Sequence, residues 1–169
     1  LEYTLHQVGP MITGGVVAHP LPRAFDVLRF YRDTCASLPD EAMLVAGLQT
    51  APDGSNAKLV GVFGGHCGPL EQGEAVFESL KAFGPPVLDA MGPIPYAALN
   101  GMLDPAFPKA ARNYWKAQFL TDLSDDAIRT LIAGFQECGK CLHCVRYTWP
   151  GKGAELPAHH AGTRTRLER

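Results

Sequence analysis

Three consecutive segments decide the fold: AMLVAGLQT (residues 42–50), APDGSNA (51–57) and KLVGVFGGH (58–66). The two outer segments are rich in apolar residues and read as strands. Pro52-Asp53-Gly54 between them is typical of a turn, because proline presets φ and glycine supplies a positive-φ position. We therefore predict an antiparallel hairpin over residues 42–66.

Further strands and helices surround this hairpin. Apolar residues recurring every three or four positions predict helices over residues 22–38 and 70–83. Gly14-Gly15 falls inside a strand predicted over residues 11–18 and indicates a bulge or a close backbone contact. The remaining predicted elements are strands over 2–8, 87–91 and 112–120, a connection over 92–95, a short helix over 96–103 and a helix capped by Ser124.

The order of these elements is β-β-α-β-β-α-β-α-β-α. Hairpins interrupt the alternation of strands and helices, so we predict an α+β fold, in which a largely antiparallel sheet carries its helices on one face. Residues 1–137 are expected to form this domain. Residues 138–169 are expected to form a divergent and poorly ordered tail.

The composition is that of a globular protein, with 46% hydrophobic and 19% charged residues among 169. A net charge of −2 argues against a nucleic-acid partner, and no apolar run approaches the roughly 20 residues that cross a membrane. Cys35 and Cys67 are predicted to be buried thiols, and His19 is expected at the surface or in a turn. We expect a cytoplasmic protein, since five cysteines do not suggest a disulfide framework.

Residues 112–120 (RNYWKAQFL) have the alternation of a strand with two different faces. One face is mostly core material, and the other carries Arg112, Tyr114, Lys116 and Gln118. Lys116 can place a cation near a substrate anion, and Tyr114 can stack on a ring or donate a hydrogen bond. The alternative is an ordinary exposed strand face, on which Lys116 extends into water.

Cys138, Cys141 and Cys144 have two successive C-x2-C spacings and could provide three thiolates for a metal. A fourth ligand at the spacing of an iron–sulfur motif is missing, because that position is Thr148. These cysteines therefore remain weak metal candidates, and we predict no metal site.

Five motifs together resemble a known family: GGVVAHPL (14–21), TAPDG (50–54), AFGPP (82–86), GPIPY (92–96) and RNYWK (112–116). In this order they resemble the substrate domain of FAD-linked oxidases related to berberine bridge enzyme and 6-hydroxynicotine oxidase. The resemblance covers residues 1–137. It implies an antiparallel sheet backed by helices, whose open face covers the isoalloxazine ring of FAD.

The resemblance also implies that two domains share the work of the enzyme, one binding FAD and the other contacting the substrate. In this family a separate domain binds FAD, the substrate lies between the flavin and the sheet, and a hydride passes to the flavin. The strand resembling RNYWK supplies side chains to that cavity, so Tyr114 and Lys116, then Gln118 and Arg112, are predicted to bind a small organic substrate. Because the FAD-binding part is not in the sequence, we expect an incomplete enzyme that is inactive alone.

The partners that we expect are an FAD-binding domain of the same or a neighbouring polypeptide and a small-molecule substrate, and a homodimer is left open. An alternative is a free-standing domain whose open sheet face binds a ligand or a protein. A third and weaker alternative is a metal-binding protein that uses Cys138, Cys141 and Cys144.

Overall fold

The computed structural model describes residues 8–51, 53–104, 120, 122–137 and 142–145. In these ranges one sheet has the strand order β4-β1-β3-β2-β6, and β5 also pairs with β1. All pairings are antiparallel. The strands are β1 (Met11–Pro20), β2 (Ala42–Thr50), β3 (Lys58–His66), β4 (Leu88–Asp89), β5 (Gly92–Pro95) and β6 (Leu142–Val145).

The hairpin of β2 and β3 has the predicted bounds and pairs over its whole length, from Ala42 opposite His66 to Thr50 opposite Lys58. Its turn is closed by a backbone hydrogen bond of 2.8 Å from Ala51 N–H to the Ala57 carbonyl. Asp53 Oδ1 accepts a hydrogen bond from Ser55 N–H at 2.9 Å. The hairpin prediction is confirmed.

One edge of β1 pairs with two different strands, and Gly15 lies between these two pairings. β5 pairs with Met11 to Gly14, and β4 pairs with Val17 and Ala18. Gly15 has φ of +141°, and a Cβ there would collide with the carbonyl oxygen of Ala90. Only glycine fits such a backbone position without strain. The close contact expected at Gly14-Gly15 is therefore present, and the neighbour is the β4–β5 connection.

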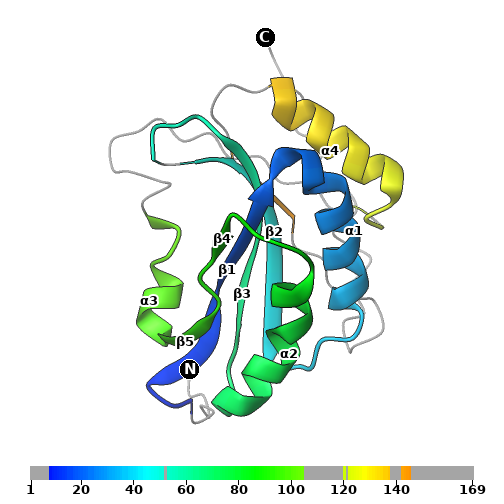
Figure 1. The fold of residues 1–169 in the computed structure, drawn as a ribbon. Helices are drawn as coiled ribbons and strands as arrows, with labels where there is room; N and C mark the ends of the chain where they lie inside the picture. Colours follow the sequence, from blue (N-terminus) through cyan, green and yellow to red (C-terminus); the bar gives the residue numbers. More distant parts are fainter. Residues whose placement is uncertain (1–7, 52, 105–119, 121, 138–141, 146–169) are drawn as a thin grey trace, which may run out of the picture.

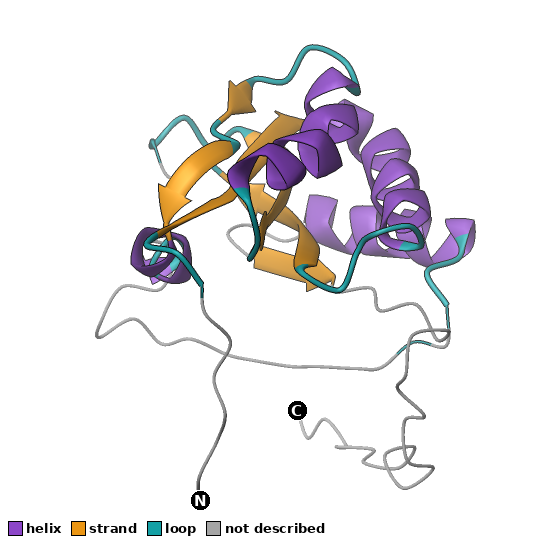
Figure 2. Ribbon diagram, turned by 90° about the horizontal axis from the view of Figure 1, so that it is seen from below, coloured by secondary structure: helices purple, strands orange, loops and turns teal. Residues whose placement is uncertain are grey.

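Three helices cover one face of the sheet, and one lies on the other side (Figures 1 and 2). The covering helices are α1 (Ala24–Cys35, after a 3-10 turn at Leu21–Arg23), α2 (Leu70–Ala82) and α4 (Asp125–Glu137). Their buried residues pack with Leu44, Leu48 and Val62 of the sheet in one core. α3 (Tyr96–Asn100) begins directly after β5.

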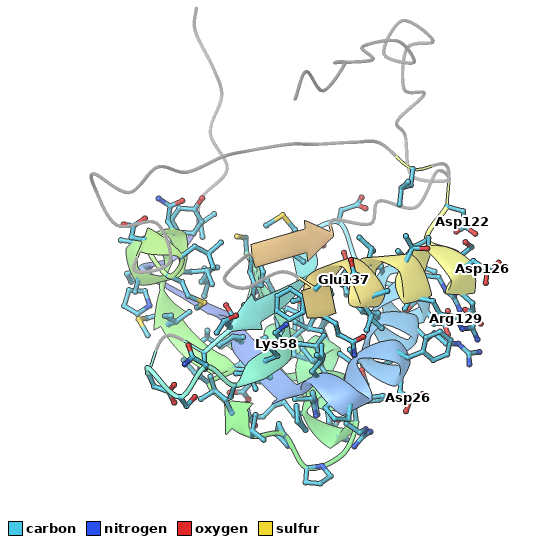
Figure 3. All side chains as sticks on the ribbon, turned by 90° about the horizontal axis from the view of Figure 1, so that it is seen from above. Asp26, Lys58, Asp122, Asp126, Arg129 and Glu137 are labelled. Atoms are coloured by element: carbon cyan, nitrogen blue, oxygen red, sulfur yellow. The ribbon has the colours of Figure 1, made fainter. Side chains whose placement is uncertain are left out.

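α4 is fixed to the rest of the domain at both ends. Ser124 Oγ accepts a hydrogen bond from Ala127 N–H at 3.2 Å, which is the predicted N-cap. At the other end Lys58 Nζ donates to the carbonyl oxygens of Phe135 and Gln136 at 3.2 and 2.6 Å. Figure 3 shows Lys58 beside this end of α4. A cation here complements the negative end of the helix dipole.

The fold class is α+β, as predicted. Several element bounds differ from the prediction: α1 ends at Cys35, α3 at Asn100, and the predicted strand over 87–91 is reduced to Leu88–Asp89. Residues 92–95, predicted as a connection, form β5. Residues 142–145, which the sequence assigns to the tail, pair with β2 as β6. The strands predicted over 2–8 and 112–120 lie largely outside the described residues.

None of the helices in the described ranges is long and apolar enough to cross a membrane.

The contact between α1 and α4 gives a pH-dependent prediction. Arg32 donates to Asp125 Oδ1 at 3.0 Å, and this hydrogen bond lowers the pKa of Asp125. A carboxyl whose pKa is lowered by folding stabilises the fold above its ordinary value of about 4, and this stability disappears as pH falls through the lowered value. We expect Asp125→Asn to lower the urea midpoint at pH 7 and to have no effect in strong acid.

Asp126→Asn is the matched control. Asp126 is also in the first turn of α4, but its side chain is 96% exposed and pairs with Arg129 of the same helix. It should have a smaller effect at pH 7 than Asp125→Asn. If both variants lowered the urea midpoint equally, the lost stability would come from the helix dipole. That result would contradict a role for the contact with Arg32.

Candidate functional site

The three central strands present two chemically different faces. Leu44, Val62 and their neighbours at alternate positions face the helices and belong to the core. The intervening residues form the opposite face, which we call the open face. It consists of Ile12, Gly14, Val16 and Ala18 of β1, Met43, Val45, Gly47 and Gln49 of β2, and Leu59, Gly61, Phe63 and Gly65 of β3.

The register and the contacts agree on this assignment. Gly14 pairs with Gly65, and both lie under the side chain of Leu99 from α3. A Cβ at Gly14 would lie 3.2 Å from Leu99 Cδ2, and one at Gly65 would lie 2.7 Å from the same atom. Therefore α3 packs on bare backbone at one end of the open face.

The middle of the open face has glycine on two neighbouring strands, because Gly47 pairs with Gly61. Ala18 pairs with Gly61 from the other side. A Cβ at Gly61 would meet Val16 Cγ2 at 3.5 Å, an ordinary contact distance. Gly47 and Gly61 are themselves buried, so the part of this face that a ligand can reach is formed by the partly exposed side chains of Val16, Val45 and Phe63.

The open face is apolar and has no charge of its own. None of its twelve residues is ionisable, and Gln49 carries its one polar side chain. Met43 is 46% exposed, while Val16, Val45 and Phe63 are partly exposed. Such a face can hold an apolar ring by contact, but it cannot supply an acid, a base or a counter-ion.

The polar residues predicted to bind substrate, Arg112, Tyr114, Lys116 and Gln118, lie outside the described residues. Their role therefore stays a prediction. The family resemblance predicted an open sheet face, but the polar residues of the sequence did not indicate that residues of β1, β2 and β3 form it. The strand alternation in residues 42–66 was the signal that could have identified it.

The described structure does not test the weak metal candidates. Cys138 and Cys141 lie outside it, and of Cys144 only the backbone is placed, opposite Gly47. In the described ranges no three His, Cys, Asp or Glu residues form a group that could hold a metal ion.

Two further thiols differ in exposure. Cys35 is buried as predicted, and burial raises its pKa to about 11, so it stays a thiol at neutral pH. Cys67 is exposed, and the prediction that it is buried was wrong. It lines an open pocket of about 380 Å³ at the start of α2 together with Val8, Met11 and Leu70.

The prediction for His19 was also wrong. Pro20 follows His19 and suggested a turn, but β1 continues to Pro20 and His19 is only 1% exposed. Its ring lies perpendicular to that of Phe83, with centroids 5.9 Å apart. Burial, and then the nearby Arg23, lower the pKa of His19.

No family model matches the sequence, and no curated protein matches it. Among solved structures, 6-hydroxy-D-nicotine oxidase from Arthrobacter nicotinovorans is similar, with a TM-score of 0.49 and 18% sequence identity. The match covers 63% of this chain and 23% of the oxidase chain. A similarity this low does not assign a function.

The α3 end and the middle of the open face should respond differently to an added methyl group. Gly65→Ala would push against Leu99 Cδ2 and is expected to destabilise the domain by about 1 kcal/mol, the low end of the cost of overpacking, because this atom ends a flexible, partly exposed side chain. Gly61→Ala meets only ordinary contacts and should be neutral or stabilising by up to about 1 kcal/mol. Urea unfolding measures both, and a larger loss in Gly61→Ala would contradict the described packing of α3.

Proposed function

We propose that this chain is the substrate-binding part of an FAD-dependent oxidoreductase, an oxidase of small organic substrates, and that it is inactive without an FAD-binding domain. The observation that carries the proposal is the open face: an apolar sheet surface without ionisable groups, opposite the face on which the helices pack to form the core. The five sequence motifs that resemble the substrate domain of FAD-linked oxidases support the same assignment.

The chemistry of the open face fits one part of FAD. Isoalloxazine is a flat ring system, and the open face offers the partly exposed apolar side chains of Val16, Val45 and Phe63 around the buried glycines 47 and 61. The diphosphate of FAD needs cations or helix N-termini, and the open face has neither. A separate domain must therefore hold the diphosphate, which agrees with the expected partner.

In this proposal a bound flavin would supply the hydride acceptor, and this chain would contribute binding and orientation. Val16, Val45 and Phe63 exclude water from one side of the cavity. Tyr114 and Lys116, with Gln118 and Arg112, are proposed to supply the polar contacts that the open face lacks. We place the complete enzyme in the cytoplasm and leave its assembly as a homodimer to experiment.

Flavin retention tests the proposal directly. The chain expressed alone should be colourless and should retain no stoichiometric FAD. A product extended into the flanking reading frames should contain an FAD-binding domain and show flavin absorbance after purification. Stoichiometric FAD on the chain alone, or flanking DNA that encodes no such domain, would contradict the proposal.

Dye binding distinguishes an apolar face that a missing domain would cover from the ordinary surface of a free-standing domain. If the open face is exposed in the isolated chain, it should enhance the fluorescence of anilinonaphthalene sulfonate. Met43→Glu should reduce this signal by at least about twofold, since it places a charge on the apolar patch.

Val87→Glu is the matched control, because Val87 is 60% exposed but lies before β4 rather than on the open face. It should leave the dye signal almost unchanged. A chain that binds no dye, or one that responds equally to both variants, would favour the free-standing binding domain.

A further inference from the structure

One side chain of the open face can change its chemistry after the protein has folded. Met43 of β2 lies opposite Gly65 and is 46% exposed. Among the twelve residues of the open face it alone contains sulfur. Peroxides convert the apolar thioether of methionine into a polar sulfoxide. Met43 is therefore the position at which an oxidant can alter the surface that the proposed function uses.

The four methionines of the chain differ in exposure and in position. Met91 is 5% exposed and belongs to the core, so peroxide reaches its sulfur only when the fold opens. Met102, which follows α3, is partly exposed. Met11 is 39% exposed, but it lines the pocket at the start of α2 together with Cys67. Met43 is thus the most exposed methionine and the one on the open face.

The strand register places Met43 beside the part of the open face that a ligand can reach. Val45 pairs with Phe63, and Phe63 pairs with Val16, so these three partly exposed side chains form one row across the sheet. Met43 lies two residues before Val45 on the same face, about 7 Å away along the strand. Because its side chain is unbranched and flexible, Met43 borders this row.

A sulfoxide at Met43 would find no side-chain hydrogen-bond donor nearby on the described part of this face. Gln49 has the one polar side chain there and lies six residues further along β2, about 20 Å away. Gly65 offers no side chain, and Leu99 packs on it. Water would hydrate the sulfoxide oxygen, and an apolar ring that covered this oxygen would remove the water. Such uncompensated desolvation weakens binding by about tenfold or more.

We propose that Met43 is a peroxide-oxidation site that changes this part of the open face from apolar to polar. A lone pair of the sulfur attacks one oxygen of hydrogen peroxide, and the O–O bond breaks. The proton of the transferred hydroxyl passes to the leaving hydroxide, which becomes water. The sulfur is oxidised by two electrons, and the peroxide is reduced by two.

Only the source of the peroxide rests on the proposed function. An oxidase that returns its electrons to oxygen releases hydrogen peroxide, and Met43 would lie beside the site of its release. The sulfoxide would then weaken the contact between the open face and an apolar ring. Peroxide from any other source would modify Met43 in the same way, so the oxidation site can be tested without flavin.

Peptide mass spectrometry of the whole chain after treatment with hydrogen peroxide tests the site. In the folded chain Met43 should gain one oxygen atom at least about tenfold faster than Met91, whereas in concentrated urea the two rates should be similar. Met43 that reacts no faster than Met91 in the folded chain would overturn the proposal.

Hydrophobic-interaction chromatography measures the change in the surface. The oxidised chain should elute earlier, and methionine sulfoxide reductases should restore the original retention. Met43→Leu is the matched variant, because leucine has a similar volume and cannot be oxidised. It keeps Met11 and Cys67, and peroxide should shift its retention less than half as much. Met11→Leu should show most of the original shift.

An equal shift in Met43→Leu and the unmodified chain would overturn the proposal, because the change in polarity would then come from other residues. Neither readout involves flavin. Failure of the flavin-retention test would contradict the proposed function without changing these results, while an equal shift would overturn the oxidation site alone.

Discussion

The close backbone contact between Gly15 and Ala90 is the constraint on which the rest of the structure depends. It allows β1 to pair with β5 before Gly15 and with β4 after it, on the same edge. The connection between them buries Met91 in the core. It also places Ile94 beside Gly14, and α3 follows with Leu99. A single glycine thus positions elements on both sides of the sheet.

The helix-facing side and the open face of the sheet have different roles. The helices bury one side in a continuous core, which stabilises the domain. The open face keeps glycine and small apolar side chains where a free-standing sheet would expose polar ones. This asymmetry is the observation that led us to propose binding for this chain and redox chemistry for a flavin held by another domain.

Much of the fold could be predicted from the sequence. The hairpin, α2 and the capped start of α4 follow from turn chemistry, apolar periodicity and Ser124. β5 was missed because Pro93 and Pro95 argue against a strand, although an edge strand tolerates proline. His19 was misplaced because burial depends on Phe83, which is distant in the sequence.

The site was harder to predict than the fold. Motifs indicate residues that do chemistry, whereas the open face is defined by missing side chains at Gly47, Gly61 and their neighbours, and by the helices on the opposite side. Such a surface appears only when the register of three strands is known. Arg112, Tyr114, Lys116 and Gln118, which the sequence did indicate, lie outside the described residues and remain predictions.

Methyl NMR during a titration with flavin mononucleotide tests the central claim most directly. The claim that the open face receives the isoalloxazine ring predicts shifts at the methyl groups of Val16 and Val45, with Val62 and Leu80 in the helix-facing core unchanged. Shifts confined to other surfaces, or no shifts at millimolar flavin, would contradict it.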